Sequence, residues 1–423
     1  MLDRKTLFLI VLALSIKGFL ALITPRSFDF INIAYMGSFK AFKLPSLTPY
    51  FFTALLMNLP FRLWLLIPIS HPPVTSFLKH GFFTTTFEAF LYMAMMKIPM
   101  IIFDGLTGLM IYKIVKFNAS RSAALTAAWL WFFNPYLTIA IEMDGTIDVV
   151  SVFFALASLY FFIKEKFGLS GVLLTIGAVA RFWPLALIPF YLIILAGKKA
   201  WRNLIAFILS FSITILAFIT SIALIKGLKV FQELSAMLIS YAAQHEFKWF
   251  LGFNISGWGW RISIGLVSLL YIFQAFLTFK FWRKDLKAIL NCGFLILLAF
   301  TAFAYWNRYY TIWVTPLLII DYALNNAAQH KKELNYKVLF ILFWVGLALF
   351  NFSLWWIPPL FFIYPYTNWL LRLDAVFKAF GTQETSSLLI PTFGRSISAA
   401  SALIYFMKVN FRGFKKEYKN IFT

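Results

Sequence analysis

Apolar runs of about 18 or more residues recur along the whole chain and are separated by short stretches that hold most of its charges. A run of that length can cross the hydrocarbon core of a bilayer as an α-helix. Only 13% of the 423 residues are charged and 61% are hydrophobic, whereas soluble domains have roughly 25% charged residues. The pattern therefore predicts an all-α polytopic membrane protein and argues against a soluble one.

The net charge of +22 indicates the topology of the chain rather than a nucleic-acid partner. Lysines and arginines gather in the turns between apolar runs, and such clusters mark the cytoplasmic side of a membrane protein. They also attract anionic lipid headgroups. We therefore expect membrane lipids as partners, no nucleic acid, and a cytoplasmic N-terminus.

Alternating these basic turns with the apolar runs predicts about twelve transmembrane helices, in a range of about 10 to 13. The segment 169–197 starts and ends beside basic turns, so it is predicted to cross twice, with a break at "ARFWP" that places Arg181 at the outer tip. The other expected spans are 6–23, 88–112, 122–140, 147–163, 203–225, 261–279, 288–304, 309–322, 338–356 and 387–407.

The whole chain, 1–423, is predicted to form a single transmembrane domain. Its outer loops, 24–85, 226–260 and 357–386, are expected to cap the outer face. Residues 48–70, "TPYFFTALLMNLPFRLWLLIPIS", are too apolar for a solvated loop and are cut by Pro49, Pro60 and Pro68. That combination predicts short helices lying in the membrane interface.

Ionisable side chains at membrane depth are costly, so each is a functional hypothesis. The outer side of the topology, which is assigned from basic turns without reference to acids, holds most of these candidates. They are Asp29, Glu142, Asp144, Asp148, Arg181 and Arg308. This one-sided placement indicates a site at the outer surface of the membrane.

Two interpretations of the acids stay open from spacing alone. Asp29 could be an exposed residue or helix cap, or a base that takes a proton from an attacking hydroxyl. Glu142 and Asp144 could be loop charges, and Asp148 could sit in a helix N-terminal turn, where the dipole favours it. Three acids within seven positions would repel one another, however, so a cation, an arginine or the hydroxyls of an acceptor should neutralise them.

The basic candidates also have two interpretations. Arg181 and Arg308 could be interface residues that snorkel, or a pair of guanidinium groups that binds a phosphate. Lys97 and Asp104 are seven residues apart in one span and so face the same side, either for catalysis or for pairing with neighbouring helices. The four histidines have no metal-ligand spacing, and a single cysteine, Cys292, permits no intrachain disulfide.

Four segments, taken in order, resemble the polyprenyl-phosphate-sugar-dependent membrane glycosyltransferases of the GT-C superfamily. The first two are "SFDFINIAY" and "MKIPMIIFDGLTGLMIYKI". The third is "WLWFFNPYLTIAIEMDGTIDVVSVFFALASLYFF" followed by "SGVLLTIGAVARFWPLALIPFYLI", and the fourth is "NRYYTIWVTPLLII". Together they cover about a third of the chain, and the resemblance lies in their order and spacing.

The resemblance implies a GT-C-like inverting hexosyltransferase, with mannose as the sugar and a lipid or glycan acceptor, acting at the outer face of the cell membrane. Asp29 would be the catalytic base. The donor phosphate would be held by Arg181, Arg308 and Lys97. The acceptor would be bound, or the site supported, by Glu142, Asp144, Asp148 and Asp104.

The resemblance implies no certain cofactor. Many relatives have two acids close together in the first loop, whereas this chain has Asp29 followed by Phe30 and Ile31. Whether a divalent cation, Mg²⁺ or Mn²⁺, takes part is therefore left open. A transporter or a flippase for lipid-linked sugars is the alternative function, and it would place charges at several depths and usually contain an internal repeat.

Overall fold

The computed structural model describes most of the predicted spans. Asp29, Asp144 and Arg308 lie outside the described residues. Apart from a few single positions, the described ranges are 4–23, 51–71, 78–79, 82–83, 87–143, 145–227, 262–282, 287–303, 310–327, 334–351 and 396–408.

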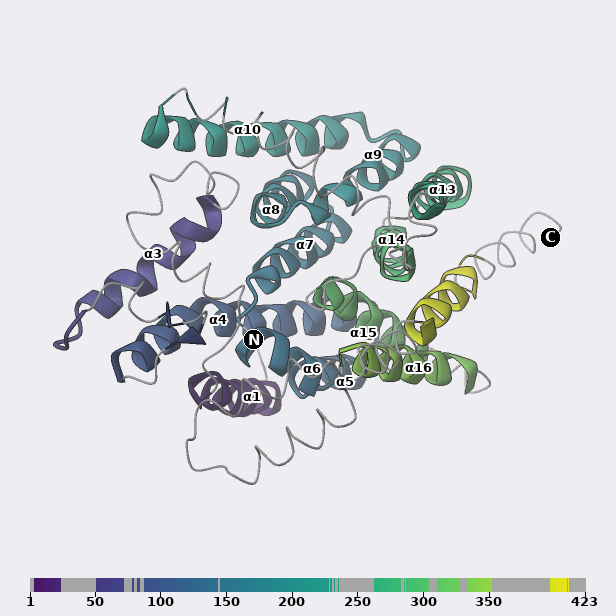
Figure 1. Cartoon of the computed structure of the whole chain (residues 1–423). Coiled ribbons are helices and arrows are strands. Elements are labelled where there is room, and N and C mark those ends of the chain that lie inside the picture. Colours follow the sequence, from purple (N-terminus) through teal and green to yellow (C-terminus); the bar gives the residue numbers. More distant parts are fainter. Residues whose placement is uncertain are drawn as a thin grey trace.

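Helices make up almost all of the described structure (Figure 1). They are α1 (Arg4–Ile23), α3 (Phe51–Leu65), α4 (Phe87–Asn118), α5 (Arg121–Phe132), α6 (Pro135–Thr138), α7 (Asp148–Ile163), α8 (Phe167–Ala180), α9 (Ile188–Gly197), α10 (Trp201–Lys226), α13 (Ile262–Leu277), α14 (Ala288–Phe303), α15 (Thr311–Ala327) and α16 (Leu334–Asn351). Residues 396–408 are also helical. Shorter helical segments of other types are η4 (Ile139–Met143), η5 (Trp183–Leu187) and η6 (Thr278–Trp282). The strands β1 (Leu78–Lys79) and β2 (Phe82–Phe83) form a small antiparallel ladder.

The helices follow the predicted spans, which confirms the all-α prediction for the described residues. α1, α7, α10 and α14 begin and end within a residue or two of the predicted bounds. The segment 169–197 forms α8 and α9, and the chain breaks at Arg181 and Phe182, as predicted. α4 continues to Asn118, past its predicted end at 112.

The predicted number of spans is not confirmed. Within the described residues, Leu91–Asn118 and Trp201–Leu224 are long and apolar enough to cross a membrane. A third span results if Arg121–Phe132 and Pro135–Glu142, which are bent by 46°, are taken as one. The other apolar helices are 10–17 residues long. The apolar helices are consistent with a helical membrane protein. The number of about twelve spans stays a prediction.

One prediction for the first outer loop is wrong. Pro60 was expected to divide the segment 48–70, but α3 runs through Pro60 as a continuous helix. The Pro60 side chain is buried, and α3 packs mainly against α4. Packing against a neighbouring helix makes a proline inside an apolar helix tolerable.

The helices that position the site pack around α7, which lies between α4 and α8 (Figure 1). α8 packs in turn on α10 at the edge of the bundle. The approach of these two helices is close at Gly171, where an added Cβ would lie 2.6 Å from the Phe207 carbonyl oxygen. α7 and α8 are antiparallel neighbours, so the start of α7 lies beside the end of α8.

The basic turns meet at one end of this packed unit. Lys164 Nζ, just after α7, lies 4.2 Å from the centre of the Phe117 ring near the end of α4. Lys198, just after α9, lies 3.9 Å from Glu165 Oε1. Asp148 and Arg181 lie at the opposite ends of α7 and α8. The predicted separation of these basic turns from Asp148 and Arg181 is confirmed here, and which end faces the cytoplasm stays a prediction.

Candidate functional site

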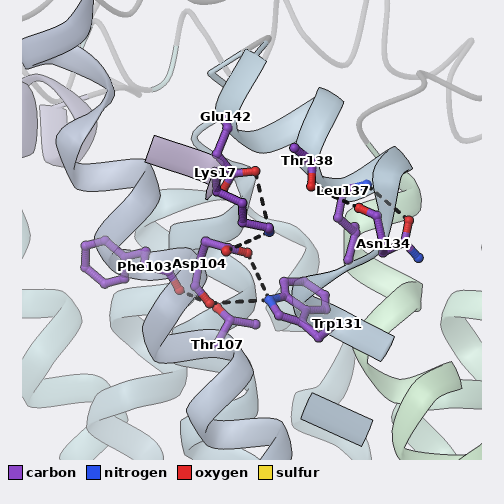
Figure 2. A network of polar contacts seen from close by, with 9 residues as sticks. All are labelled: Lys17, Phe103, Asp104, Thr107, Trp131, Asn134, Leu137, Thr138 and Glu142. Atoms are coloured by element: carbon purple, nitrogen blue, oxygen red, sulfur yellow. Dashed lines mark hydrogen bonds and ion pairs between the residues drawn. The ribbon is translucent and has the colours of Figure 1, made fainter. Parts of the chain in front are cut away.

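A buried charge network joins four elements in the interior of the helix bundle (Figure 2). Lys17 of α1 donates from Nζ to Asp104 Oδ2 of α4 at 2.8 Å. The same nitrogen lies 3.5 Å from Oε2 of Glu142, in η4. Trp131 of α5 donates from Nε1 to Asp104 Oδ1 at 2.9 Å. The Lys17, Asp104 and Glu142 side chains are at most 2% exposed, so their charged groups interact with one another rather than with water.

The path of the chain between α5 and η4 brings Trp131 and Glu142 to this network. The helix direction changes after α5, because the Asn134 side chain caps the start of α6. It accepts from the backbone nitrogens of Tyr136 and Leu137 at 3.0 and 3.3 Å. Pro135 follows in the first turn of α6, where a missing N–H costs nothing. The resulting bend of 46° lies between Trp131 and Glu142. Figure 2 shows the Trp131 side chain pointing toward Asp104 and the Glu142 side chain pointing toward Lys17.

A second charge pair lies at the facing ends of α7 and α8. Arg181 donates from Nε to Asp148 Oδ1. The Asp148 side chain is 1% exposed and that of Arg181 is 29% exposed. Asp148 lies in the first turn of α7, where the helix dipole also favours a carboxylate. The pair therefore fixes a guanidinium group, still partly exposed, at the end of the bundle away from the basic turns.

A tight turn joins the two charge clusters. Gly145 has a φ of 68°, a left-handed conformation that glycine adopts readily. The backbone nitrogen of Thr146 donates to the Ala140 carbonyl oxygen at 3.2 Å. This turn leaves Glu142 directed to Lys17 and Asp148 directed to Arg181. Of the predicted alternatives, a cation, an arginine or the hydroxyls of an acceptor, Glu142 has a lysine and Asp148 an arginine within ion-pair distance.

Lys97 and Asp104 both contact α1, which confirms that they face the same side of α4. Lys97 is fully buried, and its Nζ donates to the Ala21 carbonyl oxygen at 3.2 Å. Asp104 contacts Lys17, one helical turn before Ala21. These contacts favour pairing with a neighbouring helix, the structural alternative for the two residues. Phosphate binding by Lys97 stays a prediction.

Lys17 is the charged member of the network that sequence reasoning missed. It lies inside the first predicted span, in "ALSIKGFL", and is not one of the candidate site residues named above. A lysine within an apolar run is costly unless it is paired, and that cost was the signal that could have identified it. Its acidic partners lie 87 and 125 positions further along the chain, so no local pattern names them.

The described residues leave other predictions untested. Asp29, Asp144 and Arg308 are not among them, so whether Asp29 meets the 142–148 turn stays a prediction. Within the described part of the chain, no group of three or more His, Cys, Asp or Glu residues is placed to hold a metal ion. Participation of a divalent cation stays a prediction.

Comparison with known proteins gives one partial likeness. No family model matches this chain. A segment of 104 residues is 30% identical to GPI mannosyltransferase 1 of Saccharomyces cerevisiae. That segment covers 24% of this chain and 26% of the yeast protein, so the chain matches about a quarter of this relative. The likeness supports a glycosyltransferase of mannosyltransferase-like type in general.

Proposed function

We propose that this protein is an integral-membrane glycosyltransferase that moves mannose from a polyprenyl-phosphate donor to a lipid or glycan acceptor at the outer membrane face. The observation that carries the proposal is the likeness to GPI mannosyltransferase 1 over a quarter of the chain. That name suggests a glycosylphosphatidylinositol lipid as the acceptor to test first. The resemblance of the four sequence segments to the GT-C superfamily supports a polyprenyl-phosphate sugar as the donor. It also supports inversion of configuration at the anomeric carbon of that sugar.

In the proposed reaction, Asp29 takes the proton from the acceptor hydroxyl. The hydroxyl oxygen attacks the anomeric carbon of the donor sugar as the bond from that carbon to the phosphate oxygen breaks. The electron pair leaves with the polyprenyl phosphate, and the configuration at the anomeric carbon inverts. Fixed cations placed where the phosphate gains charge would lower the barrier.

Arg181 and Arg308 are the proposed phosphate ligands. A guanidinium group presents its N–H donors in a planar fork that matches phosphate oxygens, and the Arg181 bond from Nε to Asp148 fixes how that fork is oriented. Asp148 is thus proposed as a positioning residue that holds the Arg181 side chain in one orientation. The 29% exposure of Arg181 supports access by a lipid-linked donor.

The buried network of Lys17, Asp104 and Glu142 is proposed to support the site by holding one end of the 142–148 turn. Asp144 lies within that turn, and Asp148 closes it. Movement of Glu142 would shift the turn and, through Asp148, the guanidinium of Arg181. Contact of Asp144 with the acceptor belongs to the same proposal.

Replacement of the proposed base tests the function directly. We expect Asp29→Asn to fold normally and to lose at least about 100-fold in transfer rate, the usual contribution of a general base. The measurement is transfer of radiolabelled mannose from polyprenyl-phosphate mannose by the full-length protein in liposomes, with thermal unfolding as the folding check.

Asp285→Asn is the matched control, because Asp285 is exposed beside a basic turn and its side chain accepts only a local bond from the Lys287 nitrogen among those described. It should transfer mannose at the wild-type rate. Normal turnover by Asp29→Asn would remove Asp29 as the base. Movement of the donor across the bilayer by the wild-type protein, without transfer, would favour the flippase alternative.

A further inference from the structure

Four aromatic side chains, here called the aromatic stack, come together from three separate elements. Trp183 of η5 stacks on Trp313 of α15, with ring centres 5.7 Å apart and planes at 18°. Tyr310 stacks on Trp313 at 4.1 Å and 25°. Phe300, near the end of α14, lies 5.8 Å from Trp313. Such ring pairs hold one another in fixed orientations.

The aromatic stack belongs to the same end of the bundle as the Asp148–Arg181 pair. Trp183 follows Arg181 by two positions, directly after the break in the α8–α9 hairpin. The start of α15 is tied to α6 by a hydrogen bond from the Thr311 hydroxyl to the Tyr136 hydroxyl. α15 also contacts α7, which begins at Asp148. The stack therefore lies at the end of the bundle that the proposed function assigns to the donor.

Three polar atoms in this region are buried without a hydrogen-bond partner among the described residues. They are Nε1 of Trp183, Nε1 of Trp313 and Oδ2 of Asp148. Trp131 shows the contrast, because its indole nitrogen is also buried but donates to Asp104. Buried polar atoms are nearly always paired, and those left unpaired are costly unless a ligand completes them.

The unpaired atoms are two N–H donors on the stacked rings and one carboxylate acceptor at the same end of the bundle. A polyprenyl tail has no polar atoms that could pair with them. The phosphodiester of the donor would accept from the indoles but has no O–H group to donate to Asp148. A sugar ring fits all three features, because its hydroxyls both accept and donate and its C–H groups pack on aromatic rings.

We propose that the aromatic stack, together with Asp148 Oδ2, forms a subsite for the sugar ring of the donor, beside the Arg181 subsite for its phosphate. The subsite rests on the proposed function, since it assumes a polyprenyl-phosphate sugar as the donor. The indoles of Trp183 and Trp313 donate to sugar hydroxyls, and Asp148 accepts from one. The sugar, rather than the lipid, then decides how tightly the donor is held.

Binding measurements can separate the sugar from the phosphate and the lipid. The full-length protein in nanodiscs is titrated calorimetrically with polyprenyl-phosphate mannose and with the same polyprenyl phosphate without sugar. The wild-type protein should bind the mannose-bearing lipid more tightly. Trp313→Phe and Trp183→Phe keep a ring but remove the N–H, so each should reduce that preference on the order of tenfold. Affinity for the sugar-free lipid should stay within about twofold.

Trp64→Phe is the matched control, because Trp64 is also buried, 1% exposed, but packs with Tyr92 between α3 and α4. It should keep the wild-type preference, and thermal unfolding checks the fold of every variant. An unchanged preference in both stack variants, or an equal loss of affinity for both lipids, would overturn the sugar subsite while leaving the proposed function intact. Failure of the wild-type protein to bind either lipid would contradict the proposed donor and the subsite with it.

Discussion

At the residue scale, the contact between Lys17 and Asp104 joins two helices through side chains that are 87 positions apart in the chain. Glu142 lies near the same ammonium group, at 3.5 Å. Burial removes these charges from water, and a buried ion pair repays that cost only when its geometry is good and its partners are all present. The network is therefore more sensitive to loss of one member than to replacement of several together.

We expect Lys17→Met to destabilise the protein by about 3–5 kcal/mol, because it leaves two carboxylates buried without their ammonium partner. The free energy of unfolding, measured by denaturant titration in detergent micelles, checks this value. A triple replacement, Lys17→Met with Asp104→Asn and Glu142→Gln, should recover much of the loss, since the amides carry no charge.

Lys198→Met serves as the control for this loss. Lys198 faces Glu165 at 3.9 Å, and Glu165 is 67% exposed, so removing this surface pair should cost less than about 1 kcal/mol. If Lys17→Met lowered the free energy of unfolding no more than Lys198→Met does, the buried network would not contribute to stability as argued.

At the element scale, the close packing of α8 on α10 holds the hairpin that presents Arg181. Thr175 of α8 donates to the Phe211 carbonyl oxygen of α10 at 3.2 Å. Gly171, one turn earlier, lets the helices approach, since a Cβ there would lie 2.6 Å from the Phe207 carbonyl oxygen. The obstacle is backbone, which cannot rotate away as the end of a side chain can.

We expect Gly171→Ala to destabilise the protein by about 1–3 kcal/mol, the usual range for overpacking a core. Unfolding of the purified variant in detergent, followed by circular dichroism, measures the change. The control is Gly18→Ala in α1, where an added Cβ would meet nothing within 4 Å. That variant should be as stable as the wild type or slightly more so, because alanine favours helix. Equal behaviour of the two variants would argue against a close α8–α10 contact.

At the scale of the whole molecule, the arrangement predicts that the two ends of α8 face opposite sides of the membrane. Lys166 precedes α8 beside the basic turns, and Phe182 follows it beside Arg181. Both side chains are exposed, whereas the single cysteine, Cys292, is fully buried. Cysteines introduced at these two positions can therefore be labelled with little background.

In sealed cells, a small charged thiol reagent should label Phe182→Cys and should reach Lys166→Cys only after permeabilisation. The wild-type protein provides the background, since Cys292 should stay unlabelled. Labelling of Lys166→Cys alone in sealed cells would reverse the predicted orientation, and labelling of both would contradict a transmembrane α8.

Local sequence patterns predicted the elements well. Lengths of apolar runs gave α7 and α10 nearly to the residue, and proline chemistry placed the break at Arg181. Periodicity put Lys97 and Asp104 on one helix face. The same proline argument failed at Pro60, where packing of α3 on α4 keeps the helix continuous. Backbone preference decides a helix end only where neighbouring helices do not outweigh it.

By itself, the sequence determined that the described chain is helical and apolar, where its turns lie, and that the crowded acids between 142 and 148 need partners, either cations or the hydroxyls of an acceptor. The tertiary structure alone decided which cations these are. Lys17 reaches Glu142 because α1 packs on α4 and η4, and Arg181 reaches Asp148 because α7 and α8 are antiparallel. Helix formation follows from contacts three or four residues apart, whereas ion pairs follow from helix packing over distances in the chain that no local pattern encodes.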